Sequence, residues 1–368
     1  MPEPLKNVFT KSYLTNLSND FKLAYPDFQA EDFVASVMDS TWDALELKGR
    51  TRQITLNLGK FLPQDYPQAI AVIDRVVAAE GSWNGGFSTY FSDFVEVYGQ
   101  DPSHWDISMA ALARYTPYPS SEFAVRPFII NHPERMMAQM EAWSLDENED
   151  VRRLASEGCR PALPWGQALQ MFKQDPTPVL PILERLKGDK SLYVRKSVAN
   201  NLNDISKTHP DIVLALAKKW MGESKEAAWV AKHGARTLLK KGNPEALAIF
   251  GIGGTEGLTV SGFSLGTNTV AIGDSMAFWF TLEVERAAPT KIRLEYAIDY
   301  VKANGTRSRK IFKISELTSQ SSKTRLNYRK THEFRDLTTR KHYPGCHGLA
   351  IVVNGVAQEM LEFELCRG

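Results

Sequence analysis

The chain has 368 residues, enough for two or three domains, and 43% hydrophobic and 24% charged residues, as in an ordinary globular protein. No run approaches the roughly 18 apolar residues of a membrane-spanning helix, and the N-terminus lacks the charged-then-apolar pattern of a signal peptide. The net charge of +1 by itself indicates no nucleic-acid partner.

Residues 1 to about 250 read as short helices separated by Pro and Gly. Segments 32–47 and 65–81 space their apolar residues at helical intervals, and Gly81 is a natural stop for the second. Segments 128–148 and 177–189 continue the pattern, and no β-rich run interrupts it. The sequence therefore predicts a helical first domain, residues 1–252.

Part of this region repeats. "DVRRLASEG" (150–158) aligns with "YVRKSVANNL" (193–202) at an offset of 43 residues, and "WVAKHGARTLL" (229–239) follows 36 residues later. A period near 40 with two helices per unit is typical of a HEAT-like α-solenoid, which presents a concave face.

The repeated helix carries cations at matching positions. Solvated surface and intrarepeat salt bridges are one interpretation of these residues. Recurrence at one repeat position favours the other, a surface that follows DNA phosphates and binds them through counterion release. The residues are Arg152, Arg153, Arg195, Lys196, Lys232 and Arg236.

The residue pattern changes after "GIGGTEG" (251–257), a segment whose composition indicates a flexible connector. Seven or so alternating, β-branched and aromatic runs follow, separated by turn signals such as "ANGT" and "VNGV". They predict an immunoglobulin-like antiparallel β-sandwich over residues 258–368. The fold class is thus mainly α, a solenoid followed by an all-β domain.

The β-region is also where positive charge concentrates. Residues 291–341 hold 14 Lys/Arg against 5 Asp/Glu, a local charge of +9 on an otherwise slightly acidic chain. This block is a second candidate surface for DNA phosphates, and we take Arg307, Arg309 and Lys310 as its candidate contacts.

Familiar site motifs are absent. The sequence has no GxxxxGK[ST] loop, GxSxG, HExxH or CxxC pair. Three scattered cysteines fit reduced thiols of a cytosolic protein. His342, Cys346 and His347 lack the partners of a zinc site. We therefore expect that the protein binds neither a metal nor a cofactor. We also expect a monomer.

The remaining candidates for site residues are acidic and aromatic side chains. Glu122 follows two serines that suit a helix N-terminus, where a carboxylate is favoured; a plain first-turn residue is the alternative. Glu157 has the small neighbours Ser156, Gly158 and Cys159, which predict room for a large group to approach.

Two further candidates lie nearby in sequence. Trp165 follows two prolines that fix its backbone. Asp204 lies near the end of the helix that carries Arg195, where a simple helix-end role is the alternative.

These segments carry a family resemblance. "DVRRLASEGCRPALPWG" (150–166), with "SSEFAVRPFI" (120–129) and "SLYVRKSVANNLNDISKTHP" (191–210), resembles the AlkC-type alkylpurine DNA glycosylases, relatives of AlkD. The resemblance covers most of residues 1–250, and some members also carry an immunoglobulin-like domain. It implies excision of cationic N-alkylated bases such as 3-methyladenine, 3-methylcytosine and 1-methyladenine from double-stranded DNA, without flipping the base into a deep pocket. The expected setting is the bacterial cytosol.

The resemblance gives the candidate residues roles. Glu122 and Glu157 would be the carboxylates that stabilise positive charge on the sugar and position a water. Trp165 would face the lesion, and Asp204 is a further candidate for the same cleft. Arg160 would hold flanking phosphates together with the basic residues named above.

Two other functions stay open at this point. Solenoids are more often protein-binding scaffolds than enzymes, but a scaffold groove would expose apolar side chains where this sequence has cations. DNA binding without catalysis is the second alternative, and the presence of both carboxylates argues against it.

Overall fold

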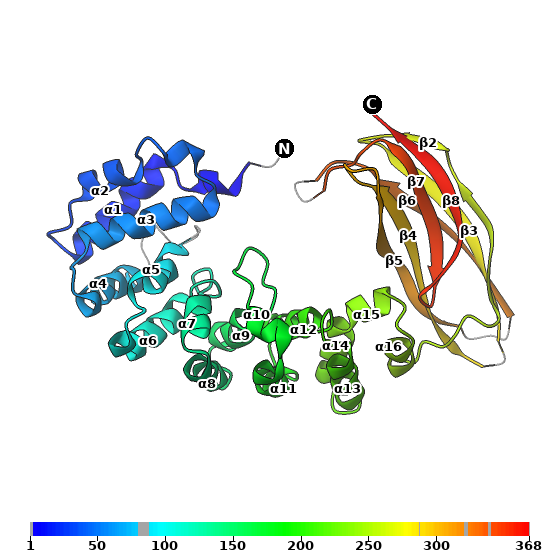
Figure 1. Cartoon of the computed structure of the whole chain (residues 1–368), viewed down its shortest axis with the longest axis horizontal. Coiled ribbons are helices and arrows are strands. Elements are labelled where there is room, and N and C mark those ends of the chain that lie inside the picture. Colours follow the sequence, from blue (N-terminus) through cyan, green and yellow to red (C-terminus); the bar gives the residue numbers. More distant parts are fainter. Residues whose placement is uncertain (1–2, 80–87, 287, 320–322, 338–339, 368) are drawn as a thin grey trace. The chain divides into compact units, whose positions relative to one another are not determined.

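The computed structural model describes residues 3–79, 88–286, 288–319, 323–337 and 340–367. The chain forms two compact units. The first comprises Met1–His209 and Ser224–Gly234, and the second comprises Pro210–Glu223 and Ala235–Gly368 (Figure 1).

The described part of the first unit consists of helices. They are η1 Leu5–Val8, α1 Lys11–Ala24, α2 Ala30–Val37, η2 Trp42–Ala44, α3 Leu47–Phe61, α4 Tyr66–Ala78, α5 Tyr90–Tyr98, η3 Pro102–His104, α6 Trp105–Tyr115, α7 Val125–Asn131, α8 Pro133–Trp143, α9 Glu149–Gly158, α10 Gln170–Gln174, η4 Thr177–Val179, α11 Leu180–Leu186, α12 Leu192–Ile205 and α14 Lys225–Gly234.

The helix α4 illustrates why these segments fold as predicted. The Asp65 side chain accepts a hydrogen bond from the Gln68 N–H at 3.1 Å, and Pro67 stands in the first turn. Ile70 and Ile73 are buried on one face. The helix ends at Ala78, and Gly81, the predicted stop, lies outside the described residues.

The segment 32–47 is not one helix as its spacing predicts. It breaks into α2 and η2 because Asp39 forms a turn, accepting hydrogen bonds from the Thr41 N–H at 2.8 Å and the Thr41 hydroxyl at 2.6 Å. The spacing of apolar residues does not reveal a polar side chain that forms a turn in place of the next helical turn.

The repeat predicted from the sequence is confirmed as a stack. Helix α9 packs on α8 and α11, α12 packs on α9 and α11, and α14 packs on α12. The second helices of successive units therefore lie side by side, as in a HEAT-like solenoid.

In its described residues, the second unit has three helices and two sheets. The helices are α13 Pro210–Trp220, α15 Arg236–Lys240 and α16 Pro244–Ile249. The strands are β1 Leu258–Leu265, β2 Thr269–Ala271, β3 Ser275–Glu285, β4 Thr290–Val301, β5 Arg307–Ser319, β6 Lys323–Glu333, β7 Gly345–Val353 and β8 Val356–Cys366. The short β2 was not predicted.

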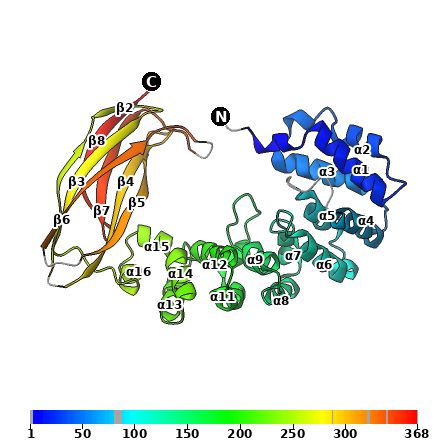
Figure 2. The same ribbon diagram turned by 180° about the vertical axis from the view of Figure 1, so that it is seen from behind.

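The strands form a sandwich of two sheets, ordered β1-β3-β6 and β2-β8-β7-β4-β5, which Figures 1 and 2 show from opposite sides. All neighbours are antiparallel except β2 and β8. Strand β3 buries alternate residues, among them Phe278 and Phe280. Central strand β4 is buried on both faces over most of its length. Asn354 and Gly355 take positive φ, as a two-residue hairpin turn requires.

The segment 251–257, predicted to be a flexible connector, is fastened to the sandwich. The buried Ile252 bridges Lys291 of β4, and the Asn354 side chain donates hydrogen bonds to the carbonyls of Gly253 at 2.9 Å and Gly254 at 3.1 Å. Its glycines therefore serve close packing more than freedom of movement.

Candidate active site

The site begins with helix α9. The Asn148 side chain caps its N-terminus by accepting a hydrogen bond from the Asp150 N–H at 2.8 Å. A Cβ added at Gly158 would lie 2.7 Å from the Val125 side chain of α7 and 3.0 Å from Met140 of α8. Gly158 thus lets three helices approach closely.

The small neighbours of Glu157 do not open a space, contrary to the prediction. Ser156 and Cys159 are fully buried, and Ser156 forms a 2.6 Å hydrogen bond with Ser197 of α12. The Asn201 amide donates to the Ser156 carbonyl at 2.8 Å. Small side chains here serve helix packing, and open space lies on the Glu157 face instead.

Carboxylates and guanidinium groups alternate along a chain of contacts at the end of α9. Arg153 pairs with Glu122 and lies 3.5 Å from Glu157 Oε1. Arg160 donates from Nη1 to Glu157 Oε1 at 2.6 Å and from Nε to Asp204 Oδ2 at 2.9 Å. This series of contacts brings together the three predicted carboxylates, Glu122, Glu157 and Asp204, which lie far apart in the sequence.

Burial makes these charges depend on one another. Glu157 is 5% exposed, Asp204 5% and Arg160 7%. Burial opposes the charge of Arg160, but Glu157 and Asp204 outweigh it and raise the pKa of the guanidinium. Arg160, predicted to hold phosphates, has its guanidinium engaged between two carboxylates.

The carboxylates differ in their free oxygens. Arg153 and the Ser120 hydroxyl, at 3.1 Å, both contact Glu122 Oε2, and no hydrogen bond of the described residues engages Glu122 Oε1 or Glu157 Oε2. Asp204, by contrast, uses both oxygens, because Lys207 donates to Oδ1 at 2.8 Å. Glu122 and Glu157 thus each keep one oxygen for another group.

Glu122 is not in a helical first turn. Helix α7 begins three residues later at Val125, and its N-cap Ala124 makes no side-chain cap. The Ser120 hydroxyl instead accepts a hydrogen bond from the Glu122 N–H at 3.3 Å. This serine turn aims the carboxylate at Arg153.

Trp165 stands at the tip of a turn. The Gly166 N–H donates to the Leu163 carbonyl at 3.1 Å, with Pro164 and Trp165 between them. Trp165 has φ +62°, which a type II turn needs at this position and which glycine normally supplies. Its side chain is 69% exposed.

The buried Arg126, which was not predicted from the sequence, holds the backbone of this loop. It is 1% exposed, and it donates to the carbonyls of Gln167 at 2.5 Å, Gly158 at 2.9 Å and Arg160 at 3.0 Å. Burial lowers its pKa to about 10. The available signal was an arginine inside the apolar run "FAVRPFII".

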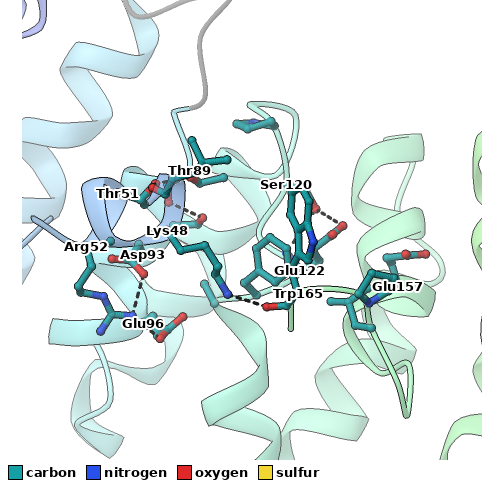
Figure 3. Close-up of a pocket in the computed structure, with 18 of the residues that line it drawn as sticks. Lys48, Thr51, Arg52, Thr89, Asp93, Glu96, Ser120, Glu122, Glu157 and Trp165 are labelled. Carbon is teal, nitrogen blue, oxygen red and sulfur yellow. Dashed lines mark hydrogen bonds and ion pairs between the residues drawn. The ribbon is translucent and has the colours of Figure 1, made fainter. Parts of the chain in front are cut away.

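A cavity of about 740 Å³ opens beside these groups (Figure 3). At one end, Arg52 Nη2 donates to Asp93 at 2.8 Å and Glu96 at 2.6 Å. Burial and the Asp93 charge raise the pKa of Glu96. Residues of α3, α5 and the site loops line the cavity, including Lys48, Thr51, Arg52, Thr89, Asp93, Glu96, Ser120, Glu122, Phe123, Glu157, Arg160 and Trp165.

The repeated cations lie in different environments. Arg152 is buried and donates to Asp189 at 2.7 and 3.1 Å, and Arg195 donates to the backbone carbonyls of Asp189 and Lys190. Lys196 is exposed, whereas Lys232 and Arg236 are half-buried. Lys196 is thus the most open cation of the set.

In the second unit, the predicted contacts lie on strand β5. Arg307 pairs with Glu362 at 2.8 Å, and Arg309 pairs with Asp299 at 2.7 and 2.8 Å. Lys310 borders a cavity of about 700 Å³ that Lys240, Lys241 and Arg340 also line.

This second cavity concentrates positive charge. No acidic side chain is among the described residues that line it. Burial, together with the charges of Arg340 and Lys240, lowers the pKa of Lys310. Cations crowded in this way are stabilised by an anion.

Metal-binding groups and membrane-spanning helices are absent from the described part of the chain. No three His, Cys, Asp or Glu side chains of those residues are grouped to hold a metal ion. None of the helices described is long and apolar enough to cross a membrane.

Comparisons with known proteins match both parts of the chain. Residues 120–239 match the family model "DNA alkylation repair enzyme", and residues 259–367 match the C-terminal Ig-like domain of uncharacterised protein YhaZ. The uncharacterized protein YhaZ of Bacillus subtilis (strain 168) is 44% identical over 362 residues, 98% of this chain and 99% of the relative.

A solved structure is similar over the same extent. The alkylpurine DNA glycosylase AlkC of Pseudomonas fluorescens, bound to DNA containing an abasic site analog, is 38% identical. The match covers 99% of each chain with a TM-score of 0.93.

Proposed function

Because the chain belongs to the family of AlkC-type DNA alkylation repair glycosylases, we propose that it hydrolyses the N-glycosidic bond of cationic N-alkylated bases in double-stranded DNA. The substrates are bases such as 3-methyladenine, 3-methylcytosine and 1-methyladenine. The base is not flipped into a deep pocket during the reaction.

The observation that supports this proposal is the pair of carboxylates with a free oxygen each. Alkylation of a ring nitrogen gives the base a positive charge, so the base leaves with the bond electrons and needs no strong general acid. The protein must stabilise the charge that develops on the sugar, and a fixed carboxylate does so with little reorganisation. Glu122 and Glu157 are held for this purpose by Arg153 and Arg160.

Glu122 and Glu157 have different roles in the proposed reaction, and Asp204 and Trp165 assist them. One free oxygen faces the sugar cation, and the other accepts a proton from the attacking water. Asp204 uses both oxygens within the protein, so its proposed role is to hold Arg160. The exposed Trp165 ring contacts the lesion, where its face attracts the cationic base.

Contact with the DNA backbone requires cations whose side chains are accessible to solvent. We assign this role to Lys196 and, with smaller accessible surface, Lys232 and Arg236. In the second unit we assign it to Arg307, Arg309 and Lys310 with the cavity that Lys310 borders. Arg152, Arg153 and Arg160 act within the protein, since carboxylates occupy their guanidinium groups and their side chains are only 8%, 14% and 9% exposed. The ion-paired Arg307 and Arg309 differ from them because 34% and 46% of their side chains stay exposed.

The direct test is to incubate the protein with methylated duplex DNA and separate the released bases by chromatography. We expect release of N-methylated bases and no release from unmethylated DNA. Absence of any methylated base at a large excess of protein would contradict the proposal. The identity of the base released fastest would define the substrate range.

A further inference from the structure

Lys48 contacts the site from a helix that the proposed chemistry does not otherwise use. It is the second residue of α3, and its Nζ donates to the Trp165 carbonyl at 2.8 Å across 117 residues of sequence. Figure 3 shows its side chain extended toward Trp165 along the wall of the cavity. The same Nζ lies 4.4 Å from the centre of the Phe123 ring, next to Glu122.

The group that Lys48 holds is a strained one. A bulky residue with positive φ is uncommon because its Cβ crowds the backbone, so Trp165 needs external contacts to keep this conformation. The turn itself supplies the Gly166 hydrogen bond, and Arg126 holds the Gln167 carbonyl two residues away. Lys48 holds the carbonyl of Trp165 itself.

We propose that Lys48 is a positioning residue that keeps the exposed Trp165 ring oriented toward the DNA lesion. The proposal rests on the proposed function, since it gives Trp165 a lesion to meet. The ammonium group fixes the peptide plane after Trp165, and this plane sets the direction of the turn.

The exposure of the Lys48 side chain raises an alternative role that the experiment must separate from positioning. Lys48 is exposed, so it could instead contact a DNA phosphate directly. The two roles differ in their dependence on Trp165. A positioning residue has no effect once the ring is removed, whereas a phosphate contact acts independently of the ring.

The experiment is a double-mutant cycle on the full-length protein with Lys48→Met, Trp165→Ala and the double variant. The readouts are the single-turnover rate of base release from methylated duplex DNA and the DNA affinity. Lys48→Met should lower the rate by about three- to tenfold, the size of one hydrogen bond, with unchanged affinity. In the Trp165→Ala background it should have no further effect.

Two variants control for charge and for hydrogen bonding. Lys48→Arg retains a cationic donor and should restore most of the rate. Lys60→Met removes an exposed lysine from the last turn of the same helix and should leave the rate unchanged. An equal loss in both Trp165 backgrounds, or a drop of about 0.9 in the salt dependence of binding, would overturn the proposal in favour of a phosphate contact.

A second measurement does not depend on catalysis. The Gly166 and Leu169 N–H groups are hydrogen-bonded within the loop, and their hydrogen exchange should be faster in Lys48→Met than in the wild type. Unchanged exchange would overturn the positioning role. Faster exchange in a protein that releases no base would instead retain it and reject the proposed function.

Discussion

Helices α9 and α12 start from the same sequence pattern and put it to different uses. In both, the first arginine of the pattern, Arg152 or Arg195, donates from Nη1 to the backbone carbonyls five and six residues before it. That arginine closes the loop that precedes its helix. The recurring loop therefore accounts for the recurrence of this arginine without any phosphate contact.

The helices diverge one residue later. In α9, Arg153 turns toward Glu122 and Glu157, whereas Lys196 at the matching place in α12 is exposed. Glu157 itself aligns with Asn200. Two carboxylates, Glu122 and Glu157, thus hold the second cation of α9 inside the protein, and among the described residues no such pair acts on Lys196 in α12.

Glu157→Gln tests this difference most strongly, because it gives α9 an uncharged amide side chain like that of α12. We expect the rate of base release to fall by about 10²–10³-fold, since the variant loses the charge that stabilises the sugar cation. DNA affinity should stay within about twofold. A collapse of affinity instead would mean that Glu157 maintains the structure, and Glu134→Gln on α8 is the matched control.

The first arginine of each pattern is tested by stability. Arg152→Met strands the carboxylate of Asp189, so we expect a loss of about 3 kcal/mol in the free energy of unfolding. Arg195→Met removes only bonds to carbonyls and should cost about 1 kcal/mol. Urea denaturation measures both, and equal losses would show that the Asp189 pair adds nothing.

The same pair of variants predicts a pH dependence. Burial opposes the Asp189 charge, but Arg152 and the Ser191 N–H outweigh it and hold the pKa of the carboxyl below its ordinary 3.8. The pair therefore stabilises the fold above about pH 4, and the contribution disappears as pH falls through the lowered pKa. The stability gap between wild type and Arg152→Met should narrow there. The gap for Arg195→Met should not change for this reason, since carbonyls do not titrate.

The sequence was sufficient for the solenoid, the sandwich and seven of the strands, because apolar period and turn residues are local signals. It was insufficient where a local competitor acts. The Asp39 turn interrupts an apolar pattern, and the three-residue β2 depends on β8 for its pairing. The connector 251–257 looked flexible because composition does not reveal Asn354 bonding to it.

For the site, the sequence suggested the acidic residues but not what each one does. Whether a carboxylate keeps a free oxygen depends on partners such as Arg160 and Lys207, which only the fold brings to Asp204. Arg152 and Lys196 are both cations of the repeated sequence pattern, yet Arg152 is buried in an ion pair and Lys196 is exposed. Spacing along one chain does not carry this information.

The smallest expected effect belongs to Lys196, the cation that α12 leaves open. Lys196→Met should not change stability, because its side chain is exposed. If it contacts one phosphate, the slope of log affinity against log salt should become shallower by about 0.9. Arg152→Met should leave that slope unchanged, since its guanidinium is occupied by Asp189. Binding titrations from low to moderate salt separate the two, and an equal change in slope would mean that both repeats present their cations to DNA.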